Sequence, residues 1–201
     1  VITIGDGIPT DFCIHANAHA LARYAALSQE AGLVPIVEPE VLMDGYHSID
    51  RCYEVTERTL AAVFEQLADH HVSLPGTLLK TNMVLSGKDA SERANVEEVA
   101  RRTVECLTKV VPADIPGVVF LSGGQSDEEA TAHLNEMNKL GSHPWELSFS
   151  YGRALQAPSL KAWKGDAANV AAGQKALYHR AKLNGLARDG SYNADMENEA
   201  A

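Results

Sequence analysis

Four short apolar runs recur along this chain, and a segment with helical character follows each of them. The runs cover residues 33–38, 77–80, 118–121 and 147–149, and residues 1–4 form a fifth. Runs that are apolar throughout, with little alternation of polar residues, are typical of parallel strands covered on both faces. Their regular alternation with helices predicts an α/β fold built on a parallel sheet.

The segments between the runs carry helix start signals. Thr10 and Ser48 can accept hydrogen bonds as N-caps. Ser126 and Glu129 have the spacing of a capping box, in which each side chain satisfies a backbone amide of the other residue. We expect helices over residues 10–30, 48–69, 96–110, 158–163 and 166–186, with one more that opens at residue 126.

Strand and helix alternate at the spacing of a TIM (β/α)8 barrel. Such a barrel closes with eight strands, so we expect this chain to hold about the last five, with roughly three to four further strands upstream. We expect residues 1–187 to form this C-terminal part of a single barrel domain. Residues 188–201 are polar and predict a flexible tail. Because an incomplete barrel exposes a sheet edge and an apolar interior, we expect the chain alone to be poorly folded.

Four of the runs end in a polar or reactive residue or lead directly to one. These residues are Glu38, Lys80, Ser122 and Arg153. In parallel α/β barrels the chemistry takes place at the carboxyl ends of the strands, which share one rim. The sequence therefore predicts a carboxylate, an amine, a hydroxyl and a guanidinium at the same rim.

Lys80 is the candidate nucleophile of this rim. An ammonium group beside buried strand residues loses hydration, which favours the neutral amine. A neutral amine can attack a carbonyl carbon and form an imine. An isolated lysine at a strand end is most often simply solvated, but the neighbouring rim residues favour a reactive role. Glu38 is a candidate general acid or base, whereas Glu40 has more the character of a solvated loop carboxylate.

Two neighbouring runs end in segments suited to an anion. Ser122 and Gly123 stand between a run and a helix start, where backbone amides and the helix dipole can face a phosphate. The alternative for this segment is an ordinary strand-to-helix turn. Gly152 and Arg153 offer a second contact, because the planar guanidinium binds phosphate through two parallel hydrogen bonds. Anion contacts from two adjacent strands resemble the phosphate site common on barrels.

Composition excludes some classes of partner. The chain of 201 residues carries 27 acidic and 17 basic residues, a net charge of −10. Nucleic acids need a basic surface, so we expect no nucleic acid partner. No apolar run approaches membrane-spanning length, so we expect no membrane partner. The odd set Cys13, Cys52 and Cys106 does not suit a disulfide framework, and we expect reduced core cysteines in a cytoplasmic protein.

The histidines raise the question of a metal. His15 and His19 are four residues apart in a predicted helix, a spacing compatible with metal binding, and His70 and His71 are adjacent. No glutamate lies between His15 and His19, as a metalloprotease motif requires, and no cysteine pair supports a zinc site. We therefore expect no metal, and histidines that are exposed or hydrogen-bonded.

Several segments together resemble class I fructose-1,6-bisphosphate aldolase. They read GLVPIVEPE at residues 32–40, GTLLKTNMV at 76–84, LSGGQS at 121–126, FSYGRALQ at 149–156 and LKAW at 160–163. Their order and spacing agree with that family over nearly the whole chain. The resemblance implies an eight-stranded barrel that cleaves fructose 1,6-bisphosphate into dihydroxyacetone phosphate and glyceraldehyde 3-phosphate, without a metal or an organic cofactor.

The resemblance also implies roles for individual residues. Lys80 matches the Schiff-base lysine, and Glu38 matches the glutamate that transfers protons and dehydrates the carbinolamine. Glu40 lies beside that site and is a weaker match. The positions that bind the ketose phosphate correspond to Ser122, Gly123, Gly152 and Arg153. A cytoplasmic homotetramer is the usual assembly of the family.

One part of the family pattern has no match in this sequence. The first strands of the family carry an aspartate base, two further active-site lysines and an arginine, which would lie before Val1. We therefore expect the chain to need the N-terminal half of the barrel, and to be nearly inactive alone.

Two other functions are alternatives to the aldolase hypothesis. One is a non-catalytic phosphosugar-binding or scaffold protein derived from an aldolase, and the other is a transaldolase-like carbon transferase. The intact pair of Lys80 and Glu38 favours an enzyme over a scaffold. The paired segments SGGQS and SYGR favour the bisphosphate aldolase over the transferase.

Overall fold

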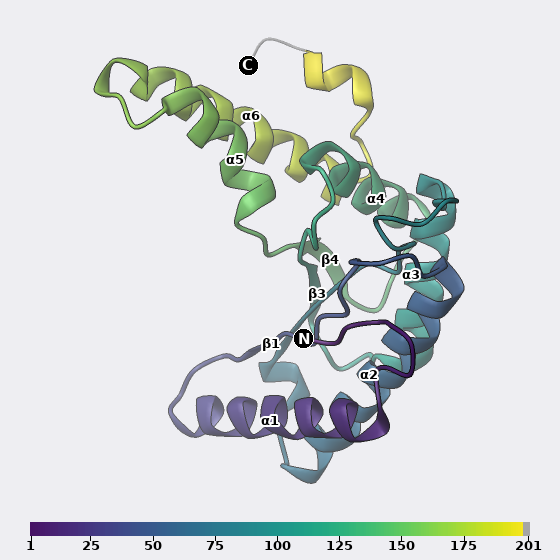
Figure 1. Cartoon of the computed structure of the whole chain (residues 1–201). Coiled ribbons are helices and arrows are strands. Elements are labelled where there is room, and N and C mark those ends of the chain that lie inside the picture. Colours follow the sequence, from purple (N-terminus) through teal and green to yellow (C-terminus); the bar gives the residue numbers. More distant parts are fainter. Residues whose placement is uncertain (199–201) are drawn as a thin grey trace.

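The computed structural model describes residues 1–198 of the chain, as helices arranged around a small sheet (Figure 1). The elements follow one another as α1 (Asp11–Glu30), β1 (Ile36–Val37), α2 (Ile49–Asp69), β2 (Leu78–Thr81), α3 (Val96–Val110), β3 (Gly117–Phe120), α4 (Asp127–Lys139), β4 (Glu146–Phe149), α5 (Arg153–Trp163) and α6 (Val170–Arg188). Within these residues, no helix has both the length and the apolar character needed to cross a membrane.

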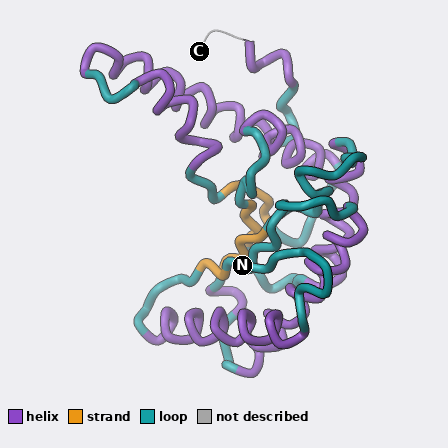
Figure 2. The backbone as a smooth tube through the Cα atoms, viewed as in Figure 1, coloured by secondary structure: helices purple, strands orange, loops and turns teal. Residues whose placement is uncertain are grey.

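The sheet is parallel, and its strand order follows the sequence as β1-β2-β3-β4. Its register pairs Val37 with Leu79, and Leu79 in turn with Val118. Helices α1, α2, α3 and α4 pack against one another in chain order, and Figure 2 shows the strands on the inner side of this row of helices. The parallel α/β architecture predicted from the alternating runs is confirmed.

The prediction of a strand at residues 1–4 is wrong. Residues 1–4 contribute one isolated parallel bridge, between Ile2 and Val41, rather than a strand. The amide of Ile2 donates to the carbonyl of Glu40, and the amide of Leu42 donates to the carbonyl of Ile2. A turn that pairs Gly5 with Ile8 follows directly. The chain leaves the sheet before a second bridge forms, so the described residues hold four strands instead of five.

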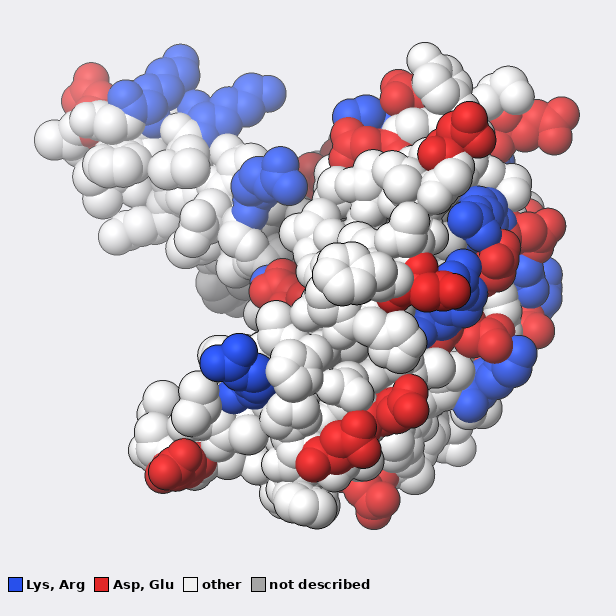
Figure 3. Space-filling model, turned by 60° about the horizontal axis from the view of Figure 1, so that its bottom comes forward, with Lys and Arg blue, Asp and Glu red and all other residues white. Residues whose placement is uncertain are grey.

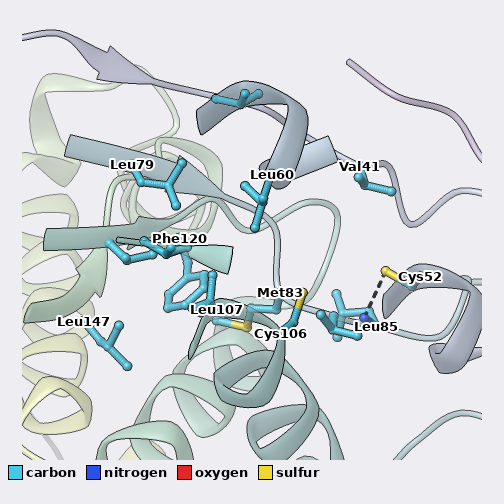
Figure 4. Close-up of a cluster of buried hydrophobic side chains, with 14 of the residues drawn as sticks. Val41, Cys52, Leu60, Leu79, Met83, Leu85, Cys106, Leu107, Phe120 and Leu147 are labelled. Atoms are coloured by element: carbon cyan, nitrogen blue, oxygen red, sulfur yellow. Dashed lines mark hydrogen bonds between the residues drawn. The ribbon is translucent and has the colours of Figure 1, made fainter. Parts of the chain in front are cut away.

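The core lies between the sheet and the helices. Leu79 and Phe120 from the strands meet Leu60 of α2 and Leu107 of α3, and all four side chains are buried (Figure 4). Along β2 the burial alternates, because successive side chains of a strand point to opposite faces. Leu79 and Thr81 face the helices and are buried, whereas Leu78 and Lys80 lie on the other face and are half-exposed.

The three cysteines agree with their expected place in the core. All are free; Cys52 and Cys106 are buried, and Cys13 is half-buried. Burial raises the pKa of the Cys106 thiol to about 12, so this thiol stays protonated near neutral pH.

Helices α5 and α6 pair as a hairpin that projects from the body (Figure 1). The helix expected at residue 158 starts five residues earlier, at Arg153. Pro158 favours a first helical turn, but here the amide of Gln156 already donates to the carbonyl of Gly152 and the proline lies inside the helix. Likewise, the helix expected from residue 166 begins at Val170, after a short 3-10 turn that Asp166 caps.

The hairpin differs in charge from the rest of the chain. Residues 153–188 contain seven of the 17 basic residues but only one of the 27 acidic ones. Figure 3 shows blue basic side chains gathered on the projecting arm, whereas the body carries both signs. The acidic character of the chain is therefore a property of its body.

Beyond α6, residues 189–198 contact the body. Tyr192 is buried, and its amide donates to the side-chain oxygen of Asn135 at 2.9 Å. Glu197 forms an ion pair with the buried guanidinium of Arg180, at 2.9 Å. The flexibility expected for residues 188–201 stays a prediction, and residues 199–201 lie outside the described part of the chain.

Candidate active site

The carboxyl ends of the four strands open into one shared pocket. Glu38 follows β1, Lys80 lies near the end of β2, Ser122 follows β3, and Arg153 opens the helix after β4. Because parallel strands end at the same edge of a sheet, these side chains converge although more than 100 residues of chain separate the first from the last.

The pocket has a volume of about 260 Å³. All residues that the sequence singled out at the rim line it, together with three more. Its lining comprises Glu38, Glu40, Lys80, Leu121, Ser122, Gly123, Ser150, Tyr151, Gly152 and Arg153. The predicted set is thus brought together in one place, including Glu40, which we expected to be a solvated loop residue.

The amine and the carboxylate are in direct contact. Nζ of Lys80 lies 2.9 Å from Oε1 of Glu38, and their side chains are 19% and 43% exposed. The contact follows from strand register, since Val37 and Leu79, the residues just before them, are partners in neighbouring strands. At this distance a proton can pass between the two groups without an intervening water.

The opposite side of the pocket suits an anion. Gly123 and Gly124 have φ values of +60° and +96°, in the left-handed region where glycine avoids steric strain. The turn that they form ends where the amide of Gln125 donates to the carbonyl of Ser122 at 3.0 Å. Arg153 is exposed beside it, and no acidic side chain within residues 1–198 pairs with its guanidinium. A free guanidinium beside a glycine turn can bind a phosphate.

A buried histidine supports this turn, and sequence reasoning missed it. Nδ1 of His133 lies 2.6 Å from Oε1 of Gln125, and Nε2 of Gln125 donates to the carbonyl of Ser122 at 3.0 Å. His133 is 2% exposed, and burial lowers its pKa to about 4. The neutral ring therefore donates from Nδ1, because an amide oxygen only accepts. The helical spacing of His133 with Ala130 and Met137 on α4 signals a buried position, but nothing in the sequence links it to the turn.

The loop after Lys80 is fixed by Asn82. Its side-chain oxygen accepts from the amide of Val41 at 2.9 Å, and its nitrogen donates to Thr56 Oγ1 at 3.1 Å and to the carbonyl of Met83 at 3.0 Å. The buried amide joins the end of β2 to helix α2 and to the segment after Glu38. Asn82 thereby links the strand end that carries Lys80 to Val41, three residues beyond Glu38.

Ser150 and Tyr151 also line the pocket without having been predicted. The Tyr151 ring packs on Phe149, with centroids 4.2 Å apart. Burial raises the pKa of the Tyr151 phenol, which keeps it protonated near neutral pH. Both residues belong to the SYGR segment, of which only Gly152 and Arg153 were predicted to contact the anion.

Comparison with known proteins decides the family. The family model described as fructose-bisphosphate aldolase class-I, glycolytic, matches residues 1–201. The chain belongs to this family of class I aldolases. The resemblance inferred from the sequence segments is therefore confirmed.

Individual aldolases agree with this assignment. A probable fructose-bisphosphate aldolase class 1 from Xanthomonas campestris is 61% identical over 193 residues, which are 96% of this chain and 58% of the relative. The cytosolic fructose-bisphosphate aldolase 4 of Arabidopsis thaliana is 55% identical, over 98% of this chain and 50% of that protein. The chain thus spans about half the length of the aldolases it matches.

A solved aldolase has the same fold over the matching part. The fructose-bisphosphate aldolase of Plasmodium falciparum, solved with TRAP and a small-molecule inhibitor, superposes with a TM-score of 0.95 at 50% identity. The match covers 96% of this chain and 56% of that one.

Proposed function

We propose that this chain carries the Schiff-base site of a fructose-bisphosphate aldolase that reversibly cleaves fructose 1,6-bisphosphate to dihydroxyacetone phosphate and glyceraldehyde 3-phosphate. The observation that carries the proposal is the 2.9 Å contact between Lys80 Nζ and Glu38 Oε1 in a pocket whose other side suits an anion. Membership of the aldolase family supports the same reaction.

In this proposal Lys80 supplies the electron sink. Its neutral amine attacks the ketone carbon, and the carbonyl oxygen takes up a proton to give a carbinolamine. Glu38 delivers a proton to the departing hydroxyl group, water leaves, and a protonated imine remains. A base then takes the proton of the neighbouring hydroxyl group, and the carbon–carbon bond breaks. Its electron pair moves toward the imine nitrogen to give an enamine, and glyceraldehyde 3-phosphate leaves. Protonation of the enamine and hydrolysis then release dihydroxyacetone phosphate and restore the amine.

The anion side of the pocket positions the ketone. Ser122, Gly123, Gly152 and Arg153 hold the ketose phosphate, so that the ketone carbon lies at Lys80. Glu40, which also lines the pocket, is a supporting carboxylate.

We further propose that the four parallel strands form part of a closed (β/α)8 barrel. β1 and β4 are the outer strands of the sheet, and closure would pair their free edges with further strands. The family resemblance assigns the base that takes the hydroxyl proton to those strands. A homotetramer in the cytoplasm is the corresponding assembly, which sedimentation of the complete protein would test.

Borohydride trapping tests the chemistry directly. The chain would be mixed with dihydroxyacetone phosphate, reduced, digested and mapped by mass spectrometry. The same experiment would use the chain joined to the N-terminal part of the Xanthomonas relative. We expect a reduced adduct on Lys80, lost in Lys80→Met and retained in Lys109→Met, which removes an exposed lysine of α3.

The outcomes separate the competing functions. An adduct in the joined protein alone would mean that the added strands complete the site. A joined protein that folds by circular dichroism and forms no adduct would refute the imine mechanism. If such a protein still bound dihydroxyacetone phosphate in an Arg153-dependent manner, the non-catalytic phosphosugar-binding function would replace the aldolase.

A further inference from the structure

Two histidines on neighbouring helices lie close together, and neither of them lines the pocket. His19 is an exposed residue of α1, and His70 is the half-buried residue that caps the C-terminal end of α2. Their ring centroids are 5.0 Å apart, with an angle of 65° between the planes. We propose that this pair binds a divalent ion of the first transition row, of the kind that prefers imidazole ligands, such as Zn²⁺ or Cu²⁺.

The spacing fits a shared ion. With metal–nitrogen bonds of about 2.1 Å and a tetrahedral angle, the centroids of two imidazoles on one ion lie roughly 5 Å apart. Both rings are reached from solvent, because His19 is exposed and His70 only partly covered. An edge-to-face contact alone is the competing explanation, and titration with metal distinguishes the two.

One residue, Gln66, sets the tautomer of both rings. Nε2 of Gln66 donates to Oδ2 of Asp69 at 3.0 Å, which fixes the orientation of the amide and leaves its oxygen for His19. Nδ1 of His19 lies 3.0 Å from that oxygen, and Nδ1 of His70 lies 2.8 Å from the backbone carbonyl of Gln66. Oxygens of amides only accept, so both Nδ1 atoms carry the hydrogen.

The free lone pairs are therefore those of the two Nε2 atoms. Histidines that bind metals characteristically donate the hydrogen of the other ring nitrogen to a carboxylate or carbonyl oxygen, which fixes the ring and raises its basicity. Here both rings already have that partner before any ion is bound.

The surroundings favour a cation. His70 caps the C-terminal end of α2, where the helix dipole is negative, and Asp69 adds a carboxylate beside it. Within residues 1–198, no group of three or more histidine, cysteine, aspartate or glutamate side chains gathers as a metal site. Water would complete the coordination, so the site is a two-histidine site of modest affinity. It is independent of the proposed aldolase activity.

Titration calorimetry with Zn²⁺ tests the site. We expect one ion per chain, with binding lost or strongly weakened in both His19→Gln and His70→Gln. His15→Gln, four residues away on α1, and His71→Gln, the neighbour of His70, are matched controls that should bind as the unchanged chain does. Gln66→Leu keeps both ligands but removes the side-chain partner of His19, and should weaken binding by about 10-fold or more.

A spectroscopic readout identifies the ligands. With Cu²⁺, electron paramagnetic resonance should report two nitrogen ligands in the unchanged chain and one in either ligand variant. Unfolding temperatures, which rise only when the ion binds the folded state, should increase with Zn²⁺ in the control variants and not in His19→Gln or His70→Gln. Binding that persists in those two folded variants, or that disappears in His15→Gln, would overturn the proposal.

Discussion

Lowering the pH from 8 to 5 should destabilise the fold through the buried imidazole of His133. Burial lowers the pKa of this ring to about 4 from the usual 6.5. The nearby Glu129 has a smaller effect that raises the pKa, and Arg93 has a smaller effect that lowers it. In the unfolded chain the ring titrates near 6.5. Between these two values the unfolded state binds more protons than the folded state does, so stability falls as the pH falls.

The size of the effect follows from the two pKa values. Stability from the neutral ring is fully present above pH 6.5 and is lost as the pH falls toward 4. The difference between the two pKa values corresponds to at most about 3 kcal/mol of unfolding free energy, of which about 2 kcal/mol is lost at pH 5. Protonation would leave the ring with a buried charge and Gln125 as its hydrogen-bond partner.

Urea unfolding followed by circular dichroism at pH 8 and pH 5 would measure this effect. His133→Asn removes the titration and keeps a donor for Gln125, so it should lose about 2 kcal/mol less stability between the two pH values than the unchanged chain does. His15→Asn, at an exposed position of α1, controls for the loss of a histidine. An equal pH dependence in His133→Asn and the unchanged chain, or an NMR titration of the His133 ring near 6.5, would refute the reasoning.

Three further substitutions have expected costs. In urea unfolding, Gly87→Ala should lower the free energy of unfolding by at least about 2 kcal/mol, because the new Cβ would overlap the carbonyl of Gly45. Gly185→Ala, where the Cβ would lie in open space on α6, should instead raise it by about 0.5–1 kcal/mol. Asn82→Ala should cost about 2–3 kcal/mol, since the buried amide of Val41 loses its acceptor; an unchanged urea midpoint would contradict this. Glu197→Gln should lower the free energy of unfolding by about 3 kcal/mol, because the buried guanidinium of Arg180 loses its negatively charged partner. Limited proteolysis after residue 188 should also become faster.

The helices of the first half were predictable because their signals are local. Thr10 and Ser48 cap α1 and α2 as expected, each accepting an amide three residues on. The segment 96–110 has the bounds predicted from its apolar spacing. A cap and a helical repeat depend on residues within one or two turns, so one sequence contains them completely.

The capping box at α4 is only half formed, for a reason that no local pattern contains. Ser126 accepts the amide of Glu129 at 3.0 Å, as predicted. The carboxylate of Glu129 does not reach back to Ser126 but pairs with Arg93 at 2.7 Å. Arg93 precedes α3, and the partnership depends on how α3 and α4 pack.

The same limit applies to the pocket. Seven of its ten lining residues were predictable because they lie at or just after the end of a strand-like run, and the carboxyl ends of parallel strands share one edge. The contact of Glu38 with Lys80 depends on strand register, and the chain from His133 through Gln125 to Ser122 depends on the packing of α4. Long-range contacts of this kind are fixed by tertiary structure rather than by spacing in the sequence.

The uneven charge of the α5–α6 hairpin has a kinetic consequence. A phosphate ester that diffuses toward this acidic chain is repelled by most of its surface, yet α5 begins at Arg153 on the pocket wall. We expect the basic arm to shift the local field near Arg153 toward attraction, and so to raise the encounter rate of anions above that expected from net charge. Because the Debye length shrinks to about 8 Å at physiological ionic strength, that advantage operates only over the last approach and fades as salt is added.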